Sequence, residues 1–160
     1  MEYAEGRLHE ALTRARAVNL VEEELPALVG LAEAARRRGD PAAARALLDD
    51  VWDAAEKGPY PLHHADALNL LAQIERDAGN HAAAVAAATA AYTKAWCDGV
   101  SADGTVCYAY AYGLTNARAH LEALGAPLPV LPPFDESAFE PMVDEPIDPP
   151  EEANDAEGDS

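Results

Sequence analysis

Residues 36–48 read RRRGDPAAARALL, and residues 75–88 read ERDAGNHAAAVAAA. Each stretch places a glycine between two runs of residues that favour helices. Glycine readily takes the left-handed conformation just past a helix end, where a side chain would be strained. The two stretches therefore predict that one helix stops and another starts at Gly39, and again at Gly79.

The residues after the glycines predict where the next helices begin. Asp40 and Asn80 are expected to be N-caps, whose side chains accept hydrogen bonds from the first free backbone N–H groups. Pro41 falls at the first helical position, where a missing N–H costs nothing. Each site is thus expected to be a tight helical hairpin.

Apolar residues line up when they are counted from these glycines, and the internal period is 40 residues. The same count from Gly6 predicts that the chain opens with the second helix of an incomplete hairpin. Leu114 and Leu121 predict a last leading helix before Gly125. The expected core positions of the opening helix are Ala11, Ala15 and Val18.

Composition and charge narrow the fold and the function. The 160 residues are 49% hydrophobic, with alanine dominant and few aromatic residues, which favours closely packed helices and an all-α fold. The net charge of −18 repels phosphate backbones and anionic lipids, so neither nucleic acid nor a membrane is an expected partner. The opening MEYAEGRLHEAL has no leader pattern and no long apolar run follows, so a cytoplasmic location is expected.

A change in composition near Gly125 predicts two parts. Residues 126–160 hold 11 acidic residues and no lysine or arginine, whereas the preceding part holds 18 acidic and 11 basic residues. This segment is rich in prolines and carboxylates, so it is expected neither to propagate a helix nor to bury enough apolar area to offset the entropy of ordering. Residues 1–125 are therefore expected to form the helical domain, and residues 126–160 a proline-rich acidic tail that is largely disordered.

The repeated pattern resembles the tetratricopeptide repeat, a helical hairpin of about 34 residues. The resemblance lies in a leucine followed by a small residue in the first helix, Gly-Asp or Gly-Asn at the turn, and alanine five residues past the glycine, and it covers residues 6–125. The glycines are 33, 40 and 46 residues apart, so extensions are expected around 52–60 and 96–108. The resemblance implies antiparallel hairpins stacked as a short solenoid that serves as a non-catalytic scaffold or adaptor for a protein or peptide.

A narrower resemblance suggests an alternative function. YPLHHADALNLLAQIERDAGN (60–80), AYTKAWCDG (91–99) and YAYGLTNARAHLEALGAP (110–127) resemble repeats of bacterial multidomain proteins that carry a signalling NTPase. This chain contains no GxxxxGK[ST] phosphate loop, so that activity is not carried over. The alternative is a regulatory or sensor fragment that works with an NTPase encoded elsewhere.

By analogy with peptide-binding members of the tetratricopeptide family, the first helices would line a concave groove. The residues implied for it are Val29, Glu33, Arg36, Arg37, Asp66, Asn69, Gln73, Arg76, Tyr112, Thr115 and Asn116. Arg36 and Arg76 occupy equivalent positions and could hold a carboxylate with an asparagine nearby. The alternative is that the arginines around Arg36 complement the negative end of their helix.

No catalytic, cofactor or metal site is expected. Adjacent histidines such as His63 and His64 point about 100° apart on a helix, which does not suit a metal. His81 and His120 have no nucleophile that the sequence places beside them, and Cys97 and Cys107 are expected to be buried, reduced thiols.

Two further hypotheses concern the ends of the chain. Phe134, Phe139 and Met142 lie among carboxylates, and this motif could dock on the Arg36, Arg37 and Arg76 side of the groove or could instead cap the last hairpin. At the other end, residues 1–25 could join two copies into a homodimer, because open repeat ends expose apolar faces.

Overall fold

The computed structural model describes residues 2–138, and within this range the chain is all-helical and has no strand. Its elements are α1 (Glu2–Ala17), α2 (Val21–Arg37), α3 (Pro41–Lys57), α4 (Pro61–Asp77), α5 (His81–Lys94), α6 (Ala111–Ala123) and a 3₁₀ turn, η1 (Glu136–Ala138). The predicted all-α class is confirmed for the described part of the chain. None of the helices there combines the length and the apolar character needed to cross a lipid bilayer.

The predicted turns lie where the glycines are. Gly39 and Gly79 both have a φ of 77°, and each separates two α-helices. Asp40 caps α3 as expected, because its side chain accepts a hydrogen bond from the backbone N–H of Ala43 at 2.9 Å. These local signals are confirmed.

The expected cap at Asn80 is wrong. Its side chain makes no capping bond with α5; instead its Nδ2 donates to the Glu75 carboxylate at 2.7 Å. A carboxylate within reach is a stronger acceptor for the amide, so the side chain turns back to α4.

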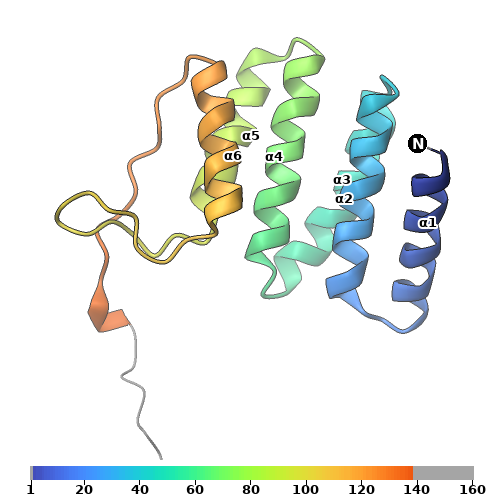
Figure 1. Cartoon of the computed structure of the whole chain (residues 1–160), viewed down its shortest axis with the longest axis horizontal. Coiled ribbons are helices and arrows are strands. Elements are labelled where there is room, and N and C mark those ends of the chain that lie inside the picture. Colours follow the sequence, from blue (N-terminus) through green and yellow to red (C-terminus); the bar gives the residue numbers. More distant parts are fainter. Residues whose placement is uncertain (1, 139–160) are drawn as a thin grey trace, which may run out of the picture.

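The opening helix differs from the prediction in what it buries. Gly6 lies inside α1, and Ala15 is buried as expected, but Ala11 is exposed and Val18 is 72% exposed. Inner helices such as α3 and α4 have neighbours on both sides, whereas α1 lies at one end of the row and packs mainly on α2 (Figure 1). The equivalent positions therefore remain uncovered on α1.

Two apolar cores meet at α4. One contains residues of α1, α2 and α3, and the other contains residues of α5 and α6. Helix α4 gives Leu70 and Ile74 to the first core and Ala65 and Ala72 to the second. This helix therefore holds the two halves together.

The expected extensions between the helical pairs take two different forms. The first, around residues 52–60, is mostly helix, because α3 continues through it before a short turn leads into α4. The second is a loop that pairs with itself: Cys107 N–H donates to Gly99 O at 2.9 Å, and Ser101 N–H donates to Thr105 O at 2.9 Å. Residues 98–108 are called the 98–108 loop below.

Residues 126–138, the first part of the predicted tail, pack back onto the 98–108 loop. Val100 N–H donates to Pro132 O and Phe134 N–H donates to Val100 O, both at 2.9 Å. The rings of Tyr108 and Phe134 lie 5.8 Å apart. These contacts give backbone groups of a proline-rich segment hydrogen-bond partners outside that segment. Residues 126–138 are therefore ordered, in contrast to the disorder expected of them. Residues 139–160 lie outside the described residues.

Helices α2, α4 and α6 lie on one face, with α3 and α5 behind them (Figure 1). Helix α3 runs back from the end of α2 to the start of α4, and α5 with the 98–108 loop runs back from the end of α4 to the start of α6. The three front helices therefore all begin at the same end of the molecule. The site described next lies on this front face.

Candidate functional site

A groove of about 410 Å³ lies between α2, α4 and α6. Its lining is mostly polar, with amides, carboxylates, one arginine and one tyrosine. The residues that line it are Val29, Glu33, Arg37, Asp66, Asn69, Leu70, Gln73, Tyr112 and Asn116. Most of the residues implied for a groove by resemblance therefore share one hollow.

The central wall of the groove comes from one face of α4. Asp66, Asn69, Leu70 and Gln73 follow one another at intervals of three, one and three residues, which keeps them on one side of a helix. Leu70 was not among the expected groove residues, and its apolar side chain also belongs to the core. The groove floor is therefore the exposed edge of the core around α4.

Asp66 is held by a tyrosine rather than by a basic residue. Both of its carboxylate oxygens lie 3.1 Å from the Tyr110 hydroxyl, which donates to them. Burial raises the pKa of Asp66 above its ordinary value, and the Tyr110 hydrogen bond opposes this only in part. Burial together with the nearby Asp66 carboxylate raises the pKa of Tyr110 to about 12, so Tyr110 stays a donor at neutral pH.

Asn69 ties α4 to α6 beneath the groove. Its side chain is 4% exposed, and its Nδ2 donates to the backbone carbonyl of Gly113 at 3.1 Å. Its other polar atom, Oδ1, is buried and accepts no hydrogen bond from any described residue. Asn69, which the resemblance implies for the groove, is therefore also a structural link between α4 and α6, and one of its acceptors is unused among the described residues.

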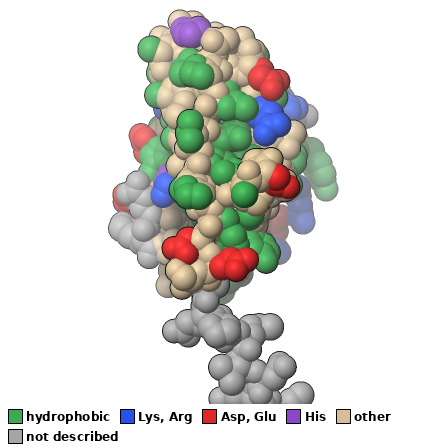
Figure 2. Space-filling view, turned by 90° about the vertical axis from the view of Figure 1, so that its left-hand side faces the viewer, with side chains coloured by type: hydrophobic (Ala, Val, Ile, Leu, Met, Phe, Trp, Pro, Cys, Tyr) green, Lys and Arg blue, Asp and Glu red, His purple; other side chains and the backbone are tan. Residues whose placement is uncertain are grey.

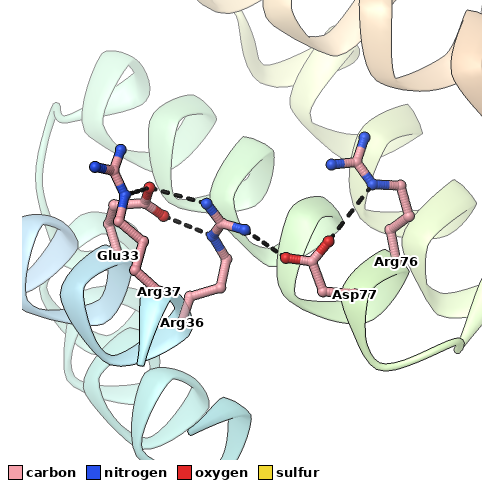
Figure 3. Close-up of polar contacts among 5 residues, drawn as sticks. All are labelled: Glu33, Arg36, Arg37, Arg76 and Asp77. Carbon is pink, nitrogen blue, oxygen red and sulfur yellow. Dashed lines mark hydrogen bonds and ion pairs between the residues drawn. The ribbon is translucent and has the colours of Figure 1, made fainter. Parts of the chain in front are cut away.

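The α2 wall carries a chain of charges that runs across to α4 (Figure 3). Arg36 binds Glu33 through Nε at 2.6 Å and also binds Asp77 of α4, while Arg37 Nε binds Glu33 at 2.6 Å. The hydrogen bond from Arg36 is the main reason that the pKa of Glu33 lies below its ordinary value. Glu33 is therefore ionised and already shared between two guanidinium groups.

Arg36 and Arg76 lie outside the groove lining, which corrects their expected place. Both stand in the last turn of their helices, and Asp77 lies between them, 3.8 Å from Arg76 Nε (Figure 3). Because the guanidinium of Arg36 is occupied by two carboxylates, a pair of free arginines ready to hold a ligand carboxylate is not present here. The charge chain instead joins the ends of α2 and α4.

On α6, the expected residues divide between two surfaces. Tyr112 and Asn116 line the groove, but Thr115 lines a separate hollow with Val106 and Leu114. Residues 115 and 116 point about 100° apart on a helix, and α6 turns the side of Thr115 away from the groove. The hydroxyl of Thr115 donates to the Ala111 carbonyl of its own helix at 2.8 Å.

The residues considered for metal or catalytic chemistry are placed as follows. His64 is buried against Trp52, with ring centres 5.5 Å apart, while His63 lies beside Tyr60. Among the side chains that the structure describes, no three from His, Cys, Asp or Glu come together as a metal site would require. Both cysteines are half-buried rather than buried, because they lie in or beside the 98–108 loop and outside the helical core.

The two ends of the molecule present apolar surface. At the first end, Val18 and Leu20 border a hollow of about 530 Å³ that is lined by α1 and the start of α2, within the residues where a homodimer contact was expected. At the other end, Figure 2 shows hydrophobic side chains gathered over α6 and the neighbouring loop. Tyr108 and Val130 are exposed there. Dimerisation stays a prediction, which a molar-mass measurement tests.

The tail hypothesis concerns three residues, of which the structure describes one. Phe134 packs on Tyr108 beside the 98–108 loop, at the end of the molecule away from α2. This position fits the capping alternative better than docking on Arg36, whose charge is already used. Phe139 and Met142 lie outside the described residues.

Comparisons with known proteins do not add an identity to this geometry. No family model, no curated protein and no solved structure matches the chain.

Proposed function

We propose that this chain is a non-catalytic protein-interaction scaffold that binds a peptide segment of a partner in the groove between α2, α4 and α6. The observation that carries the proposal is that one hollow gathers side chains from three helices that are far apart in sequence. Amides such as Gln73 and Asn116 can both donate to and accept from a peptide backbone. An extended segment laid in the groove would thus find polar partners along its length.

We further propose that the helices form a short stack of tetratricopeptide type. The support is local: both inner turns have a left-handed glycine at a spacing of 40 residues, and the leading helices α2, α4 and α6 share one face. In such stacks the leading helices line the concave surface and leave it open to partners. The fold proposal and the groove proposal therefore support each other.

Selection from a displayed library of random peptides tests the proposed function. The full chain should enrich peptides, and the double variant Gln73→Ala with Asn116→Ala should lose most of that binding because two groove amides are removed. Glu122→Ala is the control, because Glu122 is an exposed residue of α6 outside the groove lining. Equal binding by the double variant and the unchanged chain would contradict the proposal, provided that both variants keep the helical circular-dichroism signal.

The alternative function differs in its partner. If the chain is a regulatory fragment that works with a signalling NTPase, affinity capture from cells should recover such an NTPase in an equimolar complex. Capture of unrelated proteins that share a short segment would instead favour the scaffold.

A further inference from the structure

Asp66 differs from the other half-buried or buried carboxylates of the front helices. Glu33 binds two arginines, and Glu75 binds Arg45 through two bonds of 2.6 and 3.0 Å. Asp66 has a neutral donor, Tyr110, and no lysine or arginine whose side chain is described forms an ion pair with it. The charge of His63, on the same helix, is the smallest of the causes that act on the pKa of Asp66 and lowers it. The groove thus contains one carboxylate that is bonded to a neutral hydroxyl and not paired with a described arginine or lysine.

A second unused acceptor lies one helical turn away. Asn69 Oδ1 is buried and has no donor among the described residues, although Asn69 lines the groove. A buried acceptor without a partner has lost its hydrogen bonds to water and gained none in return, which destabilises the free protein. An incoming donor would remove that cost. Asp66 and Asn69 are three residues apart on α4 and therefore face the same side.

An aromatic ring completes this end of the groove. Tyr112 lines the groove from α6, is 66% exposed, and lies 6.1 Å from the ring of Tyr110. Exposed aromatic faces attract ammonium and guanidinium groups through the ring quadrupole. A carboxylate, an amide oxygen and an aromatic face are a set of groups that suits a cation with several N–H donors.

The stability of the fold does not explain why a carboxylate stands at position 66. Burial raises the pKa of Asp66, so ionising it inside the folded protein is unfavourable compared with ionising it in water. A neutral side chain of the same shape could accept the Tyr110 hydrogen bond without that cost. Groups whose pKa is strongly shifted by burial and by neighbouring groups cluster at functional sites. A bound cation would stabilise the ionised form of Asp66.

We propose that Asp66, Asn69 and Tyr112 bind a cationic side chain, arginine or lysine, of a basic peptide segment in the partner. This inference rests on the proposed function and specifies its ligand. Arginine suits the place best, because its planar fork can donate to the carboxylate and to the amide oxygen at the same time. The net charge of −18 also attracts a basic segment and repels an acidic one.

The same charge argument decides against the acidic tail of the chain as the occupant. Residues 126–160 contain 11 acidic residues and no lysine or arginine, so they offer no cation for Asp66. A separate basic segment is required.

Four pools of synthetic random nonapeptides test the inference, each with one central residue fixed as Arg, Lys, Gln or Glu. The full chain is immobilised, and the retained fraction of each pool is measured. We expect the Arg and Lys pools to be retained about tenfold more than the Gln and Glu pools, as for one added hydrogen bond to a charged group. A larger retention of Arg than of Lys would support the two-acceptor arrangement.

Variants connect this preference to the residues. Asp66→Asn should remove the preference and leave the melting temperature unchanged or raised, while Asp66→Glu should keep most of the preference because the charge remains. Asp49→Asn is the matched control: it removes the same charge from an exposed position of α3, behind the front helices. The control should keep the full preference.

The outcomes separate the two proposals. Equal retention of the Gln, Glu and Arg pools, with binding still lost in the Gln73→Ala and Asn116→Ala double variant, would overturn the cationic ligand and leave the groove proposal standing. A preference for Arg that survives Asp66→Asn would also overturn it. If no pool is retained in a way that depends on Gln73 and Asn116, both proposals fail.

Discussion

Helices α2 and α3 and helices α4 and α5 are joined by turns of the same geometry, with a φ of 77° at both glycines. The second helices of the two pairs, α3 and α5, differ in the size of the side chains that they bury. Leu48 and Val51 of α3 correspond to Ala88 and Ala91 of α5, and all four are fully buried. The difference teaches that the turn defines where two helices begin and end, while the size of the buried side chains determines how closely they pack.

The largest effect is expected from exchanging those sizes. Leu48→Ala should lower the free energy of unfolding by about 2–5 kcal/mol, because it leaves a cavity in the core between α2, α3 and α4. Ala88→Leu should lower it by about 1–3 kcal/mol for the opposite reason, overpacking against α4 and α6. Urea denaturation followed by circular dichroism measures both. An effect of Ala88→Leu close to zero would mean that α5 has room that its alanines do not indicate.

The next effect tests whether the two turns are equivalent. Gly39→Ala and Gly79→Ala should each cost about 1–2 kcal/mol, because a β-carbon is strained at positive φ. An added β-carbon would meet no neighbouring atom at either glycine, so backbone strain is the only expected cost. The two losses in unfolding free energy should therefore agree. A clear inequality would show that one turn is held by contacts beyond its own backbone.

A smaller effect separates the two residues that follow the glycines. Asp40→Ala should cost about 1 kcal/mol because the cap on α3 is lost, whereas Asp40→Asn should be nearly neutral, since asparagine caps equally well. Asn80→Asp should destabilise by about 0.2–1 kcal/mol, because its carboxylate would face that of Glu75. If Asn80→Asp proves stabilising, the side chain acts as a cap in solution. Thermal melts at low salt suffice to compare the three variants.

The smallest effect concerns pH and has opposite signs for carboxylates of the front helices. The pKa values of Glu33 and Glu75 are lowered, chiefly by bonds from Arg36 and Arg45, so their stabilisation is complete above about pH 4.5 and is lost as the pH falls through the folded values. Glu75→Gln should therefore flatten the acid side of the stability curve.

Asp66 should behave in the opposite way. Its pKa is raised by burial, so its contribution to stability is present below pH 3.8 and is lost as the pH rises through the folded value. Asp66→Asn should remove that loss, so the variant should be at least as stable as the unchanged chain at pH 7. Urea midpoints at pH 7 and pH 4 measure both variants. A destabilised Asp66→Asn at pH 7 would show that the charge itself supports the fold.

The sequence predicts the local structure of this chain. The turns at Gly39 and Gly79, the cap at Asp40 and the existence of a last helix before Gly125 depend on a few neighbouring residues, and the structure has them. Most of the groove residues implied by the family resemblance share one hollow, because residues one turn apart on a helix share a face wherever the helix lies. Thr115 fits the same helical spacing as Tyr112 and Asn116, but it lies on the side of α6 that lines the other hollow, which spacing alone does not reveal.

Long-range partners were beyond the sequence. Whether Asn80 caps α5 or binds Glu75, and whether Val18 is covered, depends on which atoms the fold brings near. The packing of residues 126–138 on the 98–108 loop likewise depends on backbone hydrogen bonds between two segments whose composition predicts no regular structure.

The sequence by itself determined that this chain forms alanine-rich helices separated by left-handed glycines, since helix signals act over a few residues. Only the tertiary structure decided that the Tyr110 hydroxyl and the Gly113 carbonyl, each 44 residues from its partner, meet Asp66 and Asn69. In the groove it thereby left one carboxylate without a described arginine or lysine partner and one buried amide oxygen without a donor among the described residues. The physical reason is that charge balance and hydrogen-bond satisfaction depend on every element packed around a group, and no local pattern contains them.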